Sequence, residues 1–95
     1  MAENLRDTLR AALEACRACS TRLEACEKLE ESLEALGETP AEALDWGAGL
    51  LYAAYSRLLE HAAREAEKAG CNEAAHALRA LARILAIEAV FEKPS

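Results

Sequence analysis

The sequence lacks a surplus of positive charge, a long apolar run and a recognisable targeting segment. Its 17 acidic residues outnumber its 11 lysines and arginines, which gives a formal net charge of −6. No long-range field therefore attracts the phosphate backbone of a nucleic acid. No apolar stretch approaches the ~20 residues that cross a bilayer, and the N-terminus lacks the basic-then-apolar pattern of a signal peptide. We therefore expect a cytoplasmic protein with no nucleic-acid partner and no membrane partner.

Large side chains are also scarce, because aromatic residues make up only 4% of the chain although 53% of its residues are hydrophobic. Much of that hydrophobic fraction is alanine, which contributes little buried area per residue. The 95 residues predict one domain, residues 1–95, of a size whose stability is often supplemented by disulfides, metals or oligomerisation. We therefore expect a core that includes many residues but buries little apolar area per residue.

Apolar residues recur at spacings of three and four, which predicts an all-α fold with three helices. The first helix is expected over residues 5–36, and Gly37 ends it. The second begins at the capping box Thr39–Glu42 and ends before Gly70, and the third runs from Asn72 to about Phe91. We expect the first two to form a long antiparallel hairpin, covered in part by the shorter third helix. The first helix has a heptad stripe of Leu5, Leu9, Ala12, Cys16, Cys19, Leu23, Cys26, Glu30 and Leu33.

Three of the four cysteines lie on that stripe, and their spacing allows several roles. Buried free cysteine packs as a small hydrophobe, so reduced, packed thiols are the default interpretation. Alternatively, Cys16 and Cys19, with Cys26, supply thiolates to Cu(I) or Zn²⁺, or the cysteines form disulfides or act in redox chemistry. A four-cysteine site in one monomer is not expected, because Cys71 is placed roughly 15 Å along the axis from Cys16.

The run Cys16-x-x-Cys19-x6-Cys26 resembles the cysteine-lined helices of the copper-storage four-helix-bundle proteins, which fill a bundle interior with thiolates. The resemblance covers about a dozen residues and does not extend to the second and third predicted helices. It implies Cu(I) as the metal of the thiolate alternative.

Two apolar surfaces are left uncovered by a three-helix protomer. One is the tip of the hairpin near Gly37, which has a charged rim, and the other is the end of the third helix, which is apolar all round. Both are typical of an interface with other helices. The predicted interface residues are Leu29, Leu33, Leu36, Leu44, Trp46, Ile84, Ile87, Val90 and Phe91.

No catalytic constellation is recognisable. His61 and His76 lie on basic helix strips that face away from the cysteine stripe, so a nucleophile, base and orienting group are not expected to meet. We expect a non-enzymatic helical module without a cofactor that self-associates, most simply as a dimer, or binds a partner helix. The alternatives are the thiolate metal protein described above and a bundle that binds a small ligand beside Gly47 and Gly49. The regular caps and stripes are typical of thermophilic or designed sequences.

Overall fold

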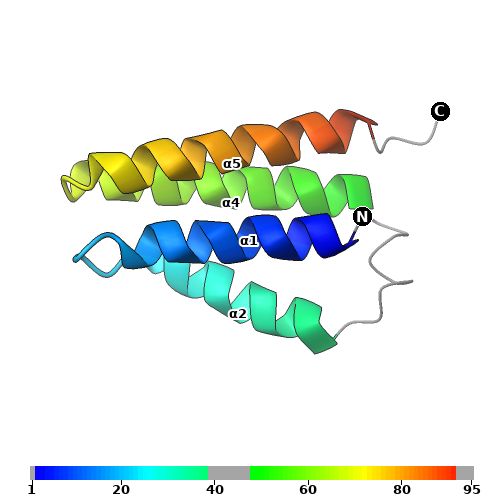
Figure 1. Cartoon of the computed structure of the whole chain (residues 1–95), viewed down its shortest axis with the longest axis horizontal. Helices are drawn as coiled ribbons and strands as arrows, with labels where there is room; N and C mark the ends of the chain where they lie inside the picture. Colours follow the sequence, from blue (N-terminus) through cyan, green and yellow to red (C-terminus); the bar gives the residue numbers. More distant parts are fainter. Residues whose placement is uncertain (1, 39–47, 92–95) are drawn as a thin grey trace.

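The computed structural model describes residues 2–38 and 48–91, and the regular elements in those ranges are all α-helices. The helices are α1 (Ala2–Arg17), α2 (Glu24–Glu38), α4 (Ala48–Lys68) and α5 (Asn72–Phe91). They run alternately in opposite directions, so that the connections at residues 18–23 and 69–71 lie at the same end of the molecule (Figure 1). The all-α prediction is confirmed for these residues.

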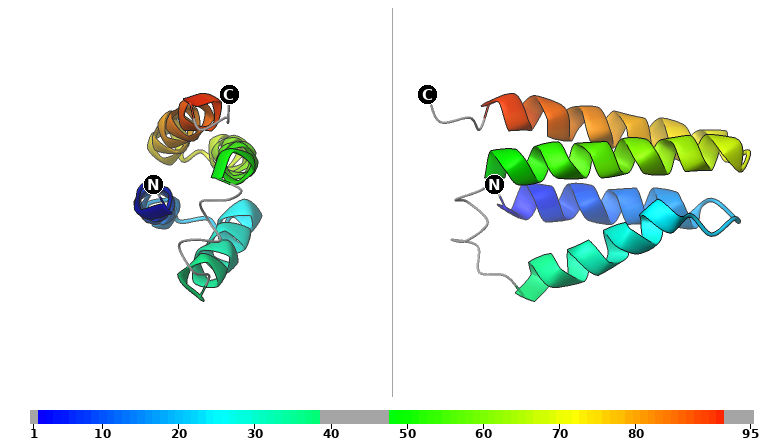
Figure 2. Two further views of the ribbon diagram at one scale, coloured as in Figure 1. Left: turned by 90° about the vertical axis from the view of Figure 1, so that its right-hand side faces the viewer. Right: turned by 180° about the vertical axis from the view of Figure 1, so that it is seen from behind.

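The predicted single helix over residues 5–36 is wrong, because the chain leaves the helix after Arg17 and re-enters it at Glu24. The amide of Ala18 is shared between the carbonyls of Glu14 and Ala15, and Cys19 N–H donates to the Cys16 carbonyl at 3.1 Å, which tightens the last turn. The chain then reverses, so that α1 and α2 form one antiparallel hairpin (Figure 2). The hairpin partner of α1 is therefore α2, whereas the sequence predicted the helix after Gly37.

The turn between α4 and α5 confirms the predicted helix end before Gly70. Gly70 has φ of +86°, a left-handed conformation that glycine adopts without the steric cost of a Cβ. The Cys71 amide donates to the Ala66 carbonyl at 2.8 Å, and the Gly70 amide donates to the Glu67 carbonyl at 3.0 Å. These two bonds form a Schellman motif that satisfies the carbonyls at the end of α4. The chain turns back within three residues, and α5 packs antiparallel along α4.

The core joins the two hairpins. α5 packs on α4 along most of its length, α1 packs on α5, α2 and α4, and α2 packs on α4. In Figure 2, α2 starts close to α1 and diverges from it towards its C-terminal end. Burial follows this divergence, since Ala25, Cys26 and Leu29 are buried whereas Leu33 is only half-buried. The largest fully buried side chains are Tyr52, Leu9, Leu29, Leu59, Leu78 and Leu85.

The helix break changes which residues of α2 face the core. The heptad stripe is buried as far as Cys26, but its next predicted member, Glu30, is exposed and Leu29 is fully buried instead. In the following helix, the spacings of three and four predict Leu58 in the central stripe and Leu59 at its flank, but Leu59 is fully buried and Leu58 only half-buried. In α2, the stripe extrapolated through a continuous helix has lost its phase, because the chain leaves the helix for several residues before Glu24.

One polar side chain is buried between α4 and α5. The Ser56 hydroxyl donates a 2.8 Å hydrogen bond to the carbonyl of Ala82 on α5. A buried hydroxyl without a partner destabilises the fold by roughly 1–3 kcal/mol, so this bond favours one alignment of the two helices.

Within residues 2–38 and 48–91, the helices are too short or too polar to span a lipid bilayer.

Candidate functional site

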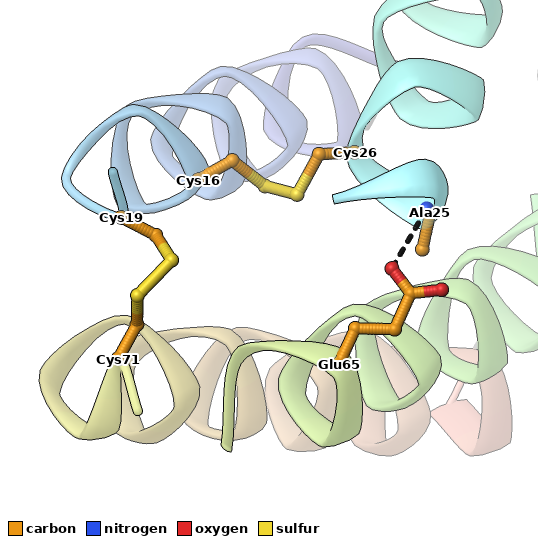
Figure 3. The surroundings of a disulfide bond; sticks show 6 residues. All are labelled: Cys16, Cys19, Ala25, Cys26, Glu65 and Cys71. Atoms are coloured by element: carbon orange, nitrogen blue, oxygen red, sulfur yellow. Dashed lines mark hydrogen bonds between the residues drawn. A yellow bond between two sulfur atoms is a disulfide. The ribbon is translucent and has the colours of Figure 1, made fainter. Parts of the chain in front are cut away.

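Four cysteines meet at the end of the molecule where both hairpins turn. Cys16 forms a disulfide with Cys26, with their Cα atoms 6.2 Å apart. Cys19 forms a second disulfide with Cys71, with their Cα atoms 5.5 Å apart. Figure 3 shows one disulfide between α1 and α2 and the other between the 18–23 loop and the start of α5. The two disulfides therefore link three helices and a loop at this end of the molecule.

This arrangement corrects two predictions about the cysteines. Packed, reduced thiols were the default interpretation, but no described cysteine is free. Cys71 was expected roughly 15 Å along the helix axis from Cys16, yet it is bonded to Cys19, one helical turn away from Cys16. Both errors come from the helix break. A continuous helix would place Cys26 about 10 Å beyond Cys19 along its axis. It would also place Cys71 beside the beginning of that helix, away from Cys19.

The cysteine cluster lies in an environment that excludes most water. Cys16, Cys19 and Cys26 have 8%, 7% and 9% of their surface exposed, whereas Cys71 is half-buried. Leu23, Ala25 and Ala66 are buried in the same core cluster. A reductant or metal ion would therefore enter beside Cys71, the most accessible of the four residues.

Glu65 of α4 connects the cluster to the N-terminus of α2. Its half-buried carboxylate accepts a 3.0 Å hydrogen bond from the amide of Ala25 (Figure 3). The first amides of a helix lack partners within the helix, and the helix dipole favours a negative charge there. Glu65 thus holds the start of α2 against α4, next to the bond that joins Cys26 to α1.

The predicted metal ligands Cys16, Cys19 and Cys26 are all engaged in these disulfides. In this oxidised state, no group of three or more histidine, cysteine, aspartate or glutamate side chains within residues 2–38 and 48–91 is placed to hold a metal ion. Thiolate metal binding accordingly stays a prediction for the reduced chain.

The small-ligand alternative also stays a prediction. It concerns Gly47, which lies outside the described residues, and Gly49, whose burial is not described either.

A second candidate site is the outer face of α5. Ile84 and Ile87 have 45% and 56% of their surface exposed, and Ala77 and Ala80 on the same face are exposed too. The spacings between these four residues are three, four and three, which is the heptad pattern of a helix that packs against another helix. The face lies opposite Leu78 and Leu85, which α5 buries in the protomer core.

The other predicted interface residues have different positions. Leu29 is fully buried within the protomer, and Leu33 packs against its core, so neither forms an exposed patch. Leu44 and Trp46 lie outside the described residues, as do the side chains of Leu36, Val90 and Phe91. Ile84 and Ile87 are therefore the predicted interface residues that the described structure exposes.

Charged groups are distributed unevenly over the surface. A shallow hollow of about 220 Å³ beside α2 is lined by Arg22 and four glutamates, while His61 and His76 are exposed on the other hairpin.

One charged pair joins α4 to α5. Glu67 of α4 accepts a hydrogen bond from the Arg79 guanidinium of α5, and this bond lowers the pKa of Glu67 below its ordinary value. The pair stabilises the α4–α5 hairpin at neutral pH, and its contribution is lost as the pH falls through that lowered pKa.

Comparisons with protein families, with curated proteins and with solved structures find no match to this chain.

Proposed function

We propose that the protein is a non-enzymatic assembly module that forms a homodimer through the outer face of α5. The exposed stripe of Ala77, Ala80, Ile84 and Ile87 is the observation that carries this proposal. Fully exposing an isoleucine side chain forfeits roughly 1.5–3 kcal/mol relative to burying it, and two of them lie about half exposed on one narrow stripe. A partner helix that covers the stripe would recover part of that free energy.

The order of small and large residues along the stripe favours a second copy of this chain as the partner. Ala77 and Ala80 occupy its first half, and Ile84 and Ile87 occupy its second half. When two α5 helices pack antiparallel about a twofold axis midway between Ala80 and Ile84, Ala77 of each copy faces Ile87 of the other and Ala80 faces Ile84. Such an interface is self-complementary, because the same contact occurs twice, and large side chains fill the space left by small ones.

The oligomeric state of the purified chain tests the proposal. We expect a dimer at tens of micromolar in sedimentation equilibrium, and a monomer for the double variant Ile84→Glu/Ile87→Glu, because two carboxylates per copy would be buried without partners. The helical circular dichroism of the variant should be retained, since both side chains are exposed in the protomer.

A matched control separates the loss of this face from the effect of added charge. Ala53→Glu/Ala54→Glu introduces the same two negative charges on exposed positions of α4 and should leave the dimer intact. A monomeric wild type would contradict the proposal. A dimer that survives the isoleucine variant would also contradict it, because another face would then form the dimer.

The cytoplasm is the location that we propose for this module. Disulfides persist inside cells mainly in hyperthermophiles, whereas in most cytosols thioredoxin and glutathione keep thiols reduced. In a reducing cytosol the four cysteines would therefore be free thiols held at one end of the fold.

A further inference from the structure

We propose that the Cys19–Cys71 disulfide is a redox switch between the two hairpins. A dithiol reductant opens this bond before the Cys16–Cys26 bond, and its loss lets the α1–α2 hairpin separate from the α4–α5 hairpin at the end where both turn. The switch goes beyond the assembly function, which concerns the outer face of α5.

The two disulfides have different places in the chain topology. Cys16–Cys26 joins α1 to α2, so it lies within the first hairpin, and we call it the intrahairpin disulfide. Cys19 belongs to the connection inside that hairpin, whereas Cys71 belongs to the turn between α4 and α5. Their bond, the interhairpin disulfide, therefore joins the turns of the two hairpins. Reducing it alone leaves the first hairpin closed by its own disulfide.

The interhairpin disulfide is also the more accessible of the two. Both ends of the intrahairpin disulfide are buried, since Cys16 and Cys26 have 8% and 9% of their surface exposed. The interhairpin disulfide has one buried end, Cys19, and one half-buried end, Cys71. The rate of thiol–disulfide exchange depends on access to the sulfur that is attacked. A reductant should therefore attack at Cys71 and open the interhairpin disulfide first.

The exchange balances with a dithiol as the co-reactant. One thiolate of the dithiol attacks Sγ of Cys71 to form a mixed disulfide, and the Cys19 sulfur leaves as a thiolate that takes a proton from solvent. The second thiolate of the dithiol then attacks the reductant's own sulfur in the mixed disulfide, and Cys71 leaves as a thiolate that is protonated in turn. The protein gains two electrons and two protons, and the dithiol is oxidised to a disulfide.

The core of the α4–α5 hairpin beside its turn is built from small side chains. The buried residues of α4 and α5 that lie nearest to the turn in the sequence are all alanines, namely Ala62, Ala63, Ala66, Ala74 and Ala75. Larger buried side chains begin farther from the turn, at Leu59 and Leu78. Because an alanine buries little apolar area, this hairpin offers little apolar surface near its turn to hold the first hairpin once the disulfide has opened.

One described hydrogen bond crosses between the hairpins at this end, and it reports on their separation. The Ala25 amide of the first hairpin donates to the Glu65 carboxylate of the second at 3.0 Å. The Glu27 amide, two positions further along, donates to the Leu23 carbonyl at 3.2 Å, which lies within the first hairpin. Separation of the hairpins should break the first bond and leave the second in place.

Timed reduction of the full-length chain tests the order of opening. The oxidised protein is treated with a limiting amount of dithiothreitol, and samples are quenched in acid, alkylated with N-ethylmaleimide and mapped by mass spectrometry. We expect an intermediate in which Cys19 and Cys71 are alkylated while the intrahairpin disulfide is intact. Ser20→Ala, an exposed change beside Cys19, is the matched control and should give the same intermediate.

Hydrogen exchange of single amides, followed by nuclear magnetic resonance, tests the separation of the hairpins. In the oxidised variant Cys19→Ala/Cys71→Ala, which lacks the switch, the Ala25 amide should lose the protection that it has in the wild type. The Glu27 amide should keep its protection, because the intrahairpin disulfide still holds the start of α2 to α1. The reduction order is measured on the wild type, so it decides the proposal even if the variant does not fold.

Two kinds of result would overturn the proposal. The first is loss of the intrahairpin disulfide before the interhairpin disulfide, or loss of both together without an intermediate. The second is a folded variant in which the Ala25 and Glu27 amides keep or lose their protection alike. None of these results involves the outer face of α5, so failure of the redox switch is distinguishable from failure of the α5 dimer.

Discussion

Replacing Cys19 and Cys71 together by alanine is expected to lower the free energy of unfolding of the oxidised protein by about 4 kcal/mol. This bridge joins residues separated by 52 positions, and a bridge that closes a longer loop restricts the unfolded chain more. Replacing Cys16 and Cys26 should have a smaller effect, about 2.7 kcal/mol, because those residues are separated by only 10 positions. Alanine avoids burying a hydroxyl group at Cys19.

Urea unfolding gives the comparison. Both double variants and the wild type are measured in their oxidised form, in a buffer that contains neither an oxidant nor a reductant. The reduced wild type supplies the control, because reduction removes the same bridges without changing the side chains. The ordering would be contradicted if the Cys16/Cys26 variant lost as much stability as the Cys19/Cys71 variant, or more.

The second large effect is expected in the core of α4. Leu59→Ala should lower the free energy of unfolding by about 3 kcal/mol, because Leu59 is fully buried and its truncation leaves a cavity that the neighbouring helices fill only in part. The adjacent Leu58→Ala is a matched control with the same change in volume. Leu58 is half-buried, so we expect about half the loss.

Chemical denaturation of the two leucine variants also determines the rotation of α4. The sequence pattern alone places Leu58 in the central stripe and Leu59 at its flank, whereas the structure reverses them. A larger loss for Leu58→Ala than for Leu59→Ala would contradict this orientation of α4, because it would mean that Leu58 faces the core.

The sequence predicted helices well where their ends have strong local signals. The helix end at Gly70 and the helix from Asn72 to Phe91 agree with the structure, and the Gly70 end does so because glycine in a left-handed turn acts through local backbone chemistry. The break after Arg17 was missed because residues 18–23 contain neither glycine nor proline. Its weak signals were Thr21-x-x-Glu24, which has the capping-box pattern, and the acidic first turn with Glu24 and Glu27.

The cysteine cluster could not be predicted without that break. The heptad stripe correctly indicated that Cys16, Cys19 and Cys26 are buried, since burial follows periodicity. The pairing of the cysteines depends on the reversal of the chain between α1 and α2. This reversal brings Cys26 beside Cys16 and leaves Cys19 at the end of the molecule where α4 turns into α5. Glu65 illustrates the same limit, since its partner, the amide of Ala25, is 40 residues away in the sequence.

The four cysteines lie at one end of the fold, paired as Cys16–Cys26 and Cys19–Cys71. Peptide mapping by mass spectrometry, after oxidation of the folded chain and alkylation of any free thiol, tests this pairing. Trypsin places each cysteine in a separate peptide, because it cleaves after Arg10, Arg17, Arg22, Lys28, Lys68 and Arg79. The structure predicts that peptide 11–17 is linked to peptide 23–28 and that peptide 18–22 is linked to peptide 69–79. A link between peptides 11–17 and 18–22, or four alkylated cysteines, would contradict it.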